Sequence, residues 1–193
     1  DLVVVGAEKM PLDLAQAFFD KFGTRPIEGY GTTELSPVAA VNVPDHRSSA
    51  AVQKGTKEGS VGRPLPGTSA RIVDPETFEE LGIDQPGLLL IKGLNVMQGY
   101  LNDPAKTAQV IRDGWYVTGD IARIDAEGFI TITDRASRFS KIGGEMVPHI
   151  KVEEVLQRIV KDGSDEENEL HVVVTAIPDE KKGERLIVVH RPF

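Results

Sequence analysis

A tyrosine between two glycines, followed by two hydroxyl residues and a carboxylate, is the first stretch with residues suited to chemistry. Glycine lets a backbone approach a ligand closely, and the Tyr30 ring can stack on a base, which contributes about 1–3 kcal/mol. Thr32 and Thr33 can donate hydrogen bonds to phosphate oxygens, and Glu34 can hold a hard cation such as Mg²⁺. A plain β-turn with Tyr30 in the core explains the same residues, so both interpretations stay open.

The second candidate is Asp120, which ends the segment Trp115-Tyr116-Val117-Thr118-Gly119-Asp120. A carboxylate just after a glycine can accept hydrogen bonds from both hydroxyls of a ribose. Each such charged hydrogen bond is worth roughly 1.5–3 kcal/mol. The alternative is that Asp120 caps a turn before a strand that begins at Ile121.

The third candidate is a basic, glycine-rich cluster that follows Asp134. It contains Arg135, Arg138, Lys141 and the pair Gly143-Gly144. The cationic side chains can meet phosphate or ribose, and the glycines can form a flexible loop that moves between two positions. A solvated linker with ordinary surface charge is the alternative.

The elements around the first candidate predict the edge of an α/β sheet over residues 1–41. Leu2 to Val5 favours a buried strand, and Ile27 begins a second strand. Between them a helix is predicted after Pro11 and before Gly23. Its apolar positions are Leu14, Ala15, Phe18, Phe19 and Phe22. A strand, a helix and a strand in this order are typical of an α/β fold.

A β-rich part is predicted over residues 60–134. Residues 42–68 are rich in glycine, proline, serine and charge, which indicates loop. The predicted strands are Ala70–Val73, Leu88–Lys92, Ile121–Ile124 and Phe129–Thr133. Asp125 to Gly128 is expected to join the last two as a hairpin. Short strands at this spacing favour a small barrel or sandwich, so the first domain, residues 1–134, is predicted to be α/β and β.

The second domain is predicted over residues 135–193. One apolar helix face is expected there, made by Val152, Val155, Leu156, Ile159 and Val160. Glu154 and Arg158 pair on the other side of this helix, and Gly163 ends it before an acidic loop over residues 164–169. Leu170–Ile177 and Arg185–His190 are predicted strands, joined through Pro178-Asp179. A helix and two strands form a thin core, so we expect an incomplete α+β domain.

Composition and charge limit the possible partners. The net charge of −8 argues against nucleic-acid binding through a basic surface. Residues 135–193 carry 10 Lys/Arg and 11 Asp/Glu, whereas residues 1–134 carry 12 and 19, so the second domain is nearly neutral. The absence of cysteine excludes disulfides and thiolate metal sites, and is compatible with the cytoplasm. No apolar run approaches the roughly 20 residues that span a bilayer.

Six segments, taken together and in order, resemble the superfamily of AMP-forming acyl-CoA synthetases, luciferases and adenylation domains. The resemblance covers nearly the whole chain. The matching segments are Val4-Val5-Gly6-Ala7-Glu8, Gly29-Tyr30-Gly31-Thr32-Thr33-Glu34, Ser60-Val61-Gly62-Arg63-Pro64, Gly93-Leu94-Asn95-Val96-Met97-Gln98-Gly99-Tyr100, Tyr116-Val117-Thr118-Gly119-Asp120, and Gly128-Phe129-Ile130-Thr131-Ile132-Thr133-Asp134-Arg135 running on to Lys141 and Gly144.

The resemblance implies a role for each matched position. Contacts to ATP or AMP fall on Gly6, Ala7, Glu8, Tyr30, Gly31, Thr32, Thr33, Asp120 and Arg135. Among these, Asp120 and Arg135 would hold the ribose, and Thr33 would contact the α-phosphate during catalysis. Glu34 would bind Mg²⁺. Asp134 would be the hinge of the small domain, and Lys141 would face the site as a catalytic residue in the second half-reaction.

The implied reaction has two steps. A carboxylate attacks the α-phosphorus of ATP and releases pyrophosphate, and the thiol of a phosphopantetheine arm then attacks the acyl-adenylate. The family's Ser/Thr/Gly-rich phosphate loop and its second catalytic lysine match no segment here, so we expect a fragment that is inactive alone. Lys151 stands where the family often has glutamate, and His149 is expected to be a loop or helix-start residue rather than a base.

The segments at residues 95–100 and 139–147 look closest to acyl-acyl-carrier-protein synthetases, which bacteria often fuse to a 2-acylglycerophosphoethanolamine acyltransferase. This implies a ligase acting on a long-chain fatty acid, with an acidic acyl carrier protein as acceptor. It also implies a cytoplasmic location, or the cytoplasmic face of the inner membrane if the parent has an upstream acyltransferase or transmembrane region. Two alternatives stay open: a long-chain fatty acyl-CoA ligase, with CoA as acceptor, and an inactive binding or structural module.

Overall fold

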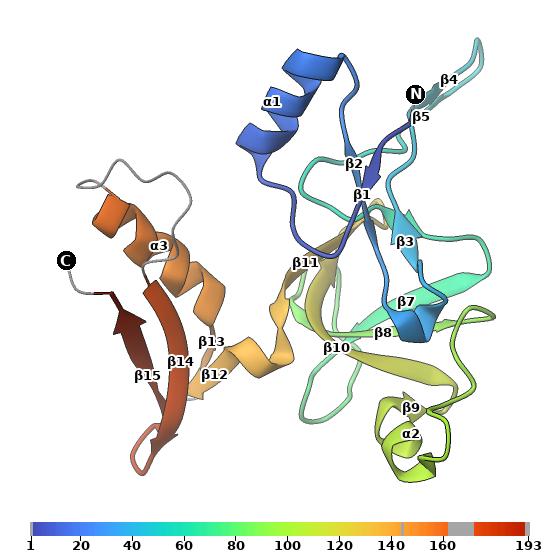
Figure 1. Ribbon diagram of the computed structural model, residues 1–193. Helices are drawn as coiled ribbons and strands as arrows, with labels where there is room; N and C mark the ends of the chain where they lie inside the picture. The colour runs from blue at the N-terminus through green and yellow to red at the C-terminus, as the bar shows by residue number, and fades with distance from the viewer. Residues whose placement is uncertain (1, 144, 162–171, 192–193) are drawn as a thin grey trace. The chain divides into compact units, whose positions relative to one another are not determined.

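The computed structural model describes residues 2–143, 145–161 and 172–191 (Figure 1). The chain divides into two compact units, Asp1–Thr133 and Asp134–Phe193. None of the described helices is long and apolar enough to cross a bilayer.

The first unit opens with the predicted strand, helix and strand, which are β1 (Val4–Val5), α1 (Leu12–Phe22) and β2 (Ile27–Tyr30). β1 and β2 are parallel, with Val5 beside Glu28. Two short antiparallel strands, β3 (Ala40–Val41) and β6 (Arg63–Pro64), complete a sheet of order β1-β2-β3-β6. The predicted α/β edge is therefore confirmed.

Helix α1 ends at Gly23, as its sequence predicts. Gly23 has a φ of 69°, and its N–H donates to the Phe19 carbonyl oxygen at 2.7 Å. Ala15 is buried, whereas Leu14 and Phe22 remain exposed. The helical spacing thus gave the right element, but most of its apolar side chains are not buried within this chain.

The β-rich part is an antiparallel sheet of order β11-β10-β8-β7, with β9 paired to β10. Its strands are β7 (Thr68–Val73), β8 (Gly87–Gly93), β9 (Ile111–Arg112), β10 (Trp115–Ile124) and β11 (Ile130–Arg135). The turn predicted at Asp125 to Gly128 lies between β10 and β11. It is closed by the Gly128 N–H, which donates to the Asp125 carbonyl oxygen at 2.9 Å. The sheet curves as a half-barrel, which fits the predicted α/β and β fold class.

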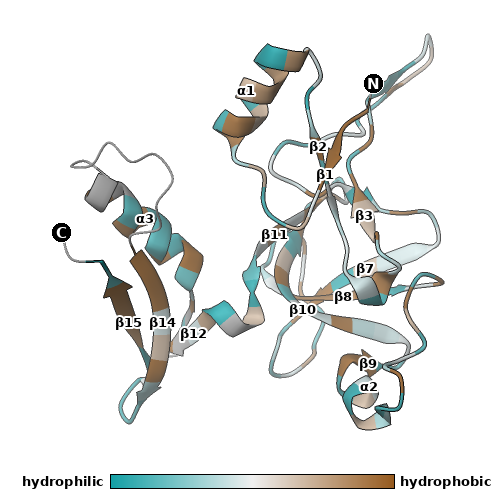
Figure 2. Ribbon diagram, in the orientation of Figure 1, coloured by the Kyte–Doolittle hydropathy of each residue, from teal (hydrophilic) through white to brown (hydrophobic). Residues whose placement is uncertain are grey.

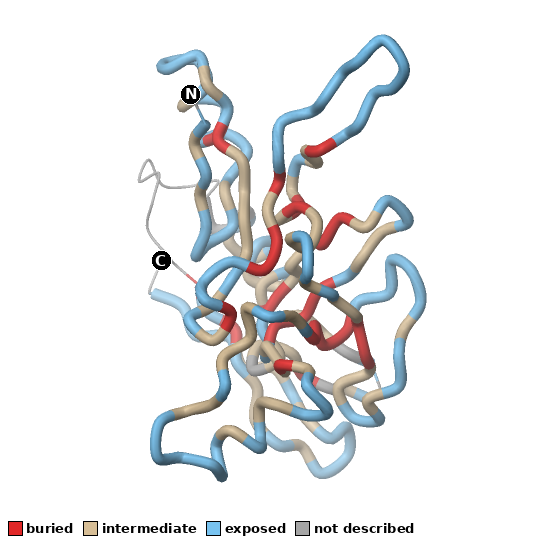
Figure 3. The backbone as a smooth tube through the Cα atoms, turned by 90° about the vertical axis from the view of Figure 1, so that its right-hand side faces the viewer, coloured by how far each residue is buried: buried red, intermediate tan, exposed pale blue. Residues whose placement is uncertain are grey.

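Backbone hydrogen bonds join the segment just before β6 to β11 of the β-rich sheet. The Val61 N–H donates to the Ile130 carbonyl oxygen, and the Ile130 N–H donates to that of Gly62, both at 2.8 Å. The buried core draws residues from both sheets and from the segment after β2, and Figure 3 shows the buried stretches of the backbone in red. It consists of Leu35, Ala39, Ala40, Ile72, Leu89, Ile91, Tyr116, Ala122 and Ile130.

Residues 42–68 are mostly irregular, as predicted, with one short exposed hairpin, β4 (His46–Arg47) and β5 (Val52–Gln53). Asn42 anchors this region, because its buried side-chain N–H₂ donates to the Ser60 carbonyl oxygen at 2.6 Å. Helix α2 (Pro104–Val110) was missed. Its signal is Asp103, whose carboxylate caps the helix by accepting from the Lys106 N–H.

The second unit is a sheet of order β13-β12-β15-β14 with one helix, α3 (His149–Lys161), packed on β14. Its strands are β12 (Phe139–Ile142), β13 (Glu145–Pro148), β14 (Val172–Asp179) and β15 (Gly183–His190). β14 and β15 confirm the two predicted strands from Val172 onward, whereas Leu170 and His171 lie outside the described residues; both strands are largely hydrophobic (Figure 2). β12 and β13 occupy the segment in which a flexible glycine loop was predicted; Gly143 lies at their turn with a φ of 61°.

The predicted apolar face of α3 is only partly correct. Val155 and Ile159 are 55% and 67% exposed, whereas Leu156 is half-buried. A polar contact joins the helix to the sheet, since the Val174 N–H donates to Glu153 Oε1 at 2.7 Å. The side chains of Arg158 and Val160, Gly163 and the acidic loop at 164–169 lie outside the described residues.

Candidate nucleotide site

The loop that carries the first candidate residues follows β2 and covers residues 31–39. It contains a short 3₁₀ helix, η1 (Thr33–Leu35). It comes back on itself so closely that a Cβ added to Gly31 would lie 1.7 Å from the Pro37 carbonyl oxygen. Only glycine fits at this position. The Ala39 N–H then returns to the Tyr30 carbonyl oxygen at 2.9 Å, which closes the loop.

The segment Gly93–Tyr100 holds this loop in place. The Asn95 side-chain N–H₂ donates to the carbonyl oxygens of Leu35 and Val38, both at 3.1 Å. The Met97 N–H donates to the Glu34 carbonyl oxygen at 2.8 Å. This positioning role of Asn95 was not predicted, because the sequence does not show which loop a distant amide reaches.

The first two candidate segments meet at Tyr30 and Asp120. The Tyr30 hydroxyl donates to Asp120 Oδ2 at 2.5 Å, and Asp120 is only 7% exposed. Asp120 lies inside β10, not in a turn before a strand, so that alternative was wrong. Its orientation depends on an irregularity between Val117 and Ile121, where Gly119 has a φ of 76°.

The hydroxyl of Tyr30 remains a donor over the whole working pH range. Burial raises its pKa well above the usual value, and the negative charge of Asp120 raises it further. The Asp120 N–H donates to Thr118 Oγ1 at 3.0 Å, which holds the carboxylate's own backbone. A carboxylate can accept about four hydrogen bonds, so Tyr30 leaves capacity for the two hydroxyls of a ribose.

Glu34 lies in a second cluster of hydroxyl groups. The Tyr100 hydroxyl donates to Glu34 Oε1 at 2.8 Å. The pKa of Glu34 is lowered, first by its own backbone N–H and then by Tyr100, while this hydrogen bond raises the pKa of Tyr100 to about 12. Tyr116 lies nearby, and its burial raises its pKa. Neither tyrosine was predicted as a site residue.

The two threonines differ in exposure. The Thr33 side chain is exposed, whereas the Thr32 hydroxyl oxygen is buried near Glu34 and Tyr116 without completing a hydrogen bond of good geometry. An uncommitted buried donor beside an exposed one fits a phosphate group, whose oxygens accept hydrogen bonds.

The residues present fit a shared magnesium site rather than a protein cage. No group of three or more His, Cys, Asp or Glu side chains that could hold a metal is found among the described residues. Glu34 supplies one ionised carboxylate, as its lowered pKa indicates. Mg²⁺ is often held by one or two carboxylates together with substrate phosphates and water, which is the arrangement that Glu34 allows.

Gly6, Ala7 and Glu8 follow the carboxyl end of β1, beside the end of β2. A Cβ added to Gly6 would lie 3.2 Å from the Gly29 carbonyl oxygen, and Ala7 has a φ of 75°. All three residues are exposed. Ligands of α/β sheets bind outside the carboxyl ends of the strands, which is where these residues and Tyr30 lie.

The third candidate segment belongs to the second unit. Asp134 is 4% exposed and accepts hydrogen bonds from the N–H groups of Arg135 at 2.8 Å and Ile150 at 3.3 Å. Arg135 is the exposed last residue of β11. The backbone of Lys141 is part of β12; its side chain and Gly144 lie outside the described residues.

His149 is the first residue of α3, which confirms the prediction of a helix-start histidine. It is buried, and its Nε2 atom lies 2.6 Å from Ser140 Oγ, which is also buried. The pair joins the first turn of α3 to β12, the strand of Lys141. Its place in the interior of the unit indicates a positioning contact.

Comparison with known proteins decides the family. The sequence model described as "AMP-binding enzyme" matches residues 1–101. These include the loop after β2 and Asn95, whose side chain holds that loop. The chain belongs to the AMP-binding enzyme family. The resemblance seen in the sequence is thereby confirmed.

Curated relatives and solved structures agree. The chain is 36% identical to a long-chain-fatty-acid–CoA ligase of Bacillus subtilis over 93% of its length and 29% of that protein. It is 36% identical to the mitochondrial medium-chain acyl-CoA ligase ACSF2 of Mus musculus over 95% of its length and 28% of that protein. The structure of ATP-bound MatB from Rhodopseudomonas palustris matches with a TM-score of 0.73 and 29% identity, over 98% of this chain and 35% of that one. The chain thus spans about a third or less of each relative.

Proposed function

We propose that this AMP-binding family chain is the nucleotide-holding part of an ATP-dependent ligase that activates a fatty acid as its acyl-adenylate. The observation that carries the proposal is the hydrogen bond from the Tyr30 hydroxyl to Asp120 Oδ2 at 2.5 Å, beside the loop that contains Glu34. The loop and β10 thereby bring together the Tyr30 ring and the Asp120 carboxylate, which can accept hydrogen bonds from a ribose. The same loop carries the hydroxyls of Thr32 and Thr33 and the carboxylate of Glu34, which can bind a cation. The two units would be the end of the large adenylate-forming domain and the beginning of the small one.

Each group has a distinct task in the first step. The substrate carboxylate oxygen forms a bond to the α-phosphorus of ATP, and the bond from that phosphorus to the pyrophosphate oxygen breaks. Tyr30 would present its ring to adenine, with its orientation fixed through Asp120. Asp120 would accept from the ribose hydroxyls, and Thr32 and Thr33 would donate to the phosphate. Bound Mg²⁺, held by Glu34, would supply charge neutralisation at the phosphates.

In the second step a thiol sulfur bonds to the acyl carbon, and AMP leaves. We assign the acceptor as the phosphopantetheine of an acyl carrier protein, because residues 95–100 and 139–147 resemble acyl-carrier-protein synthetases. Asp134 would be the pivot, Arg135 a ribose contact and Lys141 a catalytic residue after rotation. A parent enzyme of this kind works in the cytoplasm or at the cytoplasmic face of the inner membrane.

A CoA acceptor is the second candidate, favoured by the names of the two relatives, both of which are CoA ligases. Direct competition tests the two. The full-length enzyme is given ATP, a long-chain fatty acid, and either acyl carrier protein or CoA at equal thiol concentration. Faster thioester formation on the carrier protein supports the first assignment, and faster formation on CoA replaces it. No acid-dependent pyrophosphate exchange with any fatty acid would contradict the proposed function itself.

A further inference from the structure

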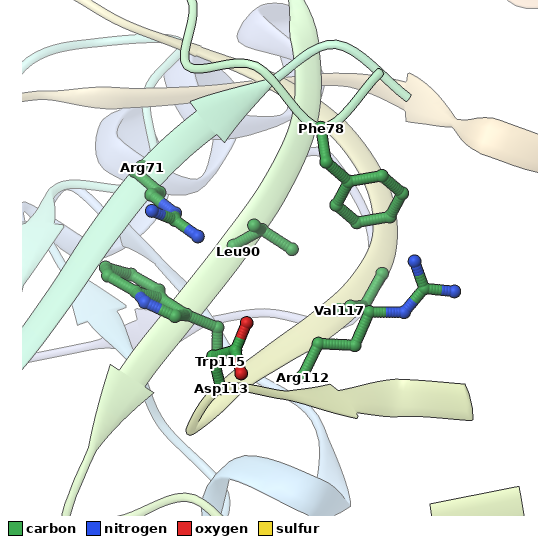
Figure 4. Close-up of a pocket in the computed structure, with 7 residues that line it drawn as sticks. All are labelled: Arg71, Phe78, Leu90, Arg112, Asp113, Trp115 and Val117. Atoms are coloured by element: carbon green, nitrogen blue, oxygen red, sulfur yellow. The ribbon is translucent and has the colours of Figure 1, made fainter. Parts of the chain in front are cut away.

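A cavity of about 340 Å³ lies in the first unit, away from the residues assigned to the nucleotide (Figure 4). Its apolar floor is formed by Leu90 of β8 and Val117 of β10, which pair in register, and Arg71 of β7 pairs with Leu90 from the other side. Trp115 lies on the same face as Val117, because alternate residues of a strand share a face. Tyr116, between them, belongs to the core.

Two cation–aromatic pairs form opposite walls of this cavity. The Arg71 guanidinium lies 4.3 Å from the centre of the Trp115 ring, and the Arg112 guanidinium lies 4.5 Å from that of Phe78. Figure 4 shows the first pair on one side of Leu90 and the second on the other. The lining therefore combines an apolar floor, two aromatic walls and two guanidinium groups.

Neither arginine of the cavity donates a hydrogen bond to another residue in the part of the chain that the structure describes. Within the described residues, Arg71 and Arg112 make these ring contacts but no hydrogen bond or ion pair. The Arg71 Nε atom is buried without a partner. Buried donors are nearly always satisfied in native proteins, and planar guanidinium groups match phosphate and carboxylate oxygens. These donors point to a ligand that brings acceptors with it.

One acidic group opposes an anion here. Asp113 lines the cavity, and its backbone carbonyl oxygen accepts a hydrogen bond from Lys92 Nζ at 3.3 Å. Lys92 Nζ also lies 5.8 Å from the centre of the Trp115 ring. The lining itself thus holds two guanidinium groups and one carboxylate, with Lys92 beside them.

We propose that this cavity is a second binding site, for a small planar aromatic molecule that carries an anionic group. The ring would lie on the apolar floor between Trp115 and Phe78, and the anion would meet Arg71 and Arg112. The site is on the face of β10 opposite to Tyr116 and is independent of the proposed ligase function, so it can fail while that function stands.

Trp115 is the only tryptophan of the chain, so its indole N–H gives a single nuclear magnetic resonance signal that reports on the cavity directly. The 193-residue chain is titrated with phenyl phosphate, which has both the ring and the anion. Inorganic phosphate and benzyl alcohol supply each half alone. We expect a saturable shift with phenyl phosphate at millimolar concentration, and at least tenfold weaker responses to the two halves.

Three variants test the residues. Arg112→Gln, at an exposed position, is expected to weaken phenyl phosphate binding about tenfold, the loss of one charge-assisted hydrogen bond. Arg71→Gln is expected to do the same, with dispersion of the backbone signals as the check on folding. Asp113→Asn removes the opposing charge at a residue with a φ of 51°, which asparagine tolerates; binding should tighten several-fold. Arg123→Gln, at an exposed position paired with Asp84, is the matched control and should change nothing.

The result that overturns the proposal is equally specific. It is overturned by a linear, unsaturated shift, by equal responses to benzyl alcohol or inorganic phosphate, or by binding that Arg112→Gln leaves unchanged. If Arg71→Gln does not fold, Arg112→Gln and Asp113→Asn, with their opposite expected signs, still decide the matter.

Discussion

The Tyr30 hydroxyl lies 2.5 Å from Asp120 Oδ2, although 90 residues separate the two in the sequence. This contact joins the loop after β2 to the irregular middle of β10. It also makes each residue part of the other's environment, because the ring is held by the carboxylate and the buried carboxylate accepts a hydrogen bond from the phenol. A substitution of either residue therefore also changes the hydrogen bonding of the other, and its effect on binding includes both changes.

Asp120→Ala in the full-length enzyme is expected to weaken ATP binding by about 1.5–3 kcal/mol, the worth of a hydrogen bond to a charged group. The measurement is acid-dependent pyrophosphate exchange as a function of ATP concentration. Tyr30→Phe is the comparison variant: it keeps the ring and loses only the hydroxyl, so it should weaken ATP binding less than Asp120→Ala, because the carboxylate that would accept from the ribose remains. An apparent ATP affinity unchanged in Asp120→Ala would remove this residue from the ribose site.

Asn95→Ala should loosen the loop without touching the nucleotide groups. It removes the two side-chain hydrogen bonds to the carbonyl oxygens of Leu35 and Val38 and the one that Asn95 Oδ1 accepts from Thr68 Oγ1, which predicts a loss of about 1–3 kcal/mol in unfolding free energy. Trp115 fluorescence during urea unfolding follows the first unit. Gln98→Ala, at an exposed position in the same segment, is the control and should stay within about 0.5 kcal/mol of the parent. Equal effects of the two substitutions would argue against the clamp.

All three tyrosines of the chain have raised pKa values, which predicts an unusual alkaline titration. The tyrosinate absorbance of the folded chain should not rise around pH 10, the usual value. For Tyr100, with a pKa of about 12 when folded against 10.0 otherwise, the stabilising contribution is present below pH 10 and lost as the pH rises through 12. Glu34→Gln is expected to return one tyrosine toward the usual range.

Circular dichroism at each pH keeps this titration interpretable, since unfolding would release all three tyrosines together. A one-tyrosine step near pH 10 in the folded parent chain that Glu34→Gln leaves unchanged, with no second step moved by the substitution, contradicts the Tyr100–Glu34 contact. Glu34 itself has a lowered pKa, so its own contribution is present above its usual value of 4.5 and lost as the pH falls through the folded value.

Local sequence patterns predicted the helices and strands well where a residue that ends a helix or forms a turn marks the boundary. Gly23 ended α1 at the expected place, and Asp125 to Gly128 formed the turn between β10 and β11. The strand at Ile121 was started six residues late. Gly119 looked like a strand boundary, whereas the structure uses its positive φ to bend a continuous strand.

Contacts between distant segments were beyond local patterns. Tyr30, Glu34 and Asp120 were selected by residue type and by family resemblance, but Tyr100 and Tyr116 were not, because an aromatic residue in a strand or loop looks the same whether or not it meets a carboxylate. The same limit applies to burial. Val155 has the spacing of a core residue, yet it is exposed, since only one face of α3 meets β14.

Asp134→Pro tests the proposed hinge. Proline fixes φ near −65°, so in the full-length enzyme it should retain adenylate formation and lose thioester formation. Asp134 also accepts two backbone hydrogen bonds through its carboxylate, and Asp134→Ala is needed to separate that loss from the restricted backbone. The half-reactions are followed by pyrophosphate exchange and by thioester yield. If alanine and proline impair both steps equally, the position is structural.

The nearly neutral second unit bears on the choice of acceptor. Arg138 and Lys151 are two cations of this unit that an acidic carrier protein could meet, but they differ in the structure. Arg138 forms an ion pair with Glu153, whose other oxygen accepts the Val174 N–H, so its charge is already used within the fold. Lys151 is exposed in the first turn of α3. A reversal at Lys151 should therefore affect docking more cleanly than one at Arg138.

Lys151→Glu in the full-length enzyme is expected to raise the apparent Michaelis constant for acyl carrier protein several-fold, because steering between opposite charges is lost. The effect should shrink as salt is added. Free pantetheine has no such surface, so its kinetics should hardly change. Lys181→Glu, exposed between β14 and β15, is the matched reversal and should leave both thiols unaffected. If Lys151→Glu leaves carrier-protein kinetics unchanged and CoA is the faster acceptor, the acyl-CoA ligase takes the place of the carrier-protein assignment.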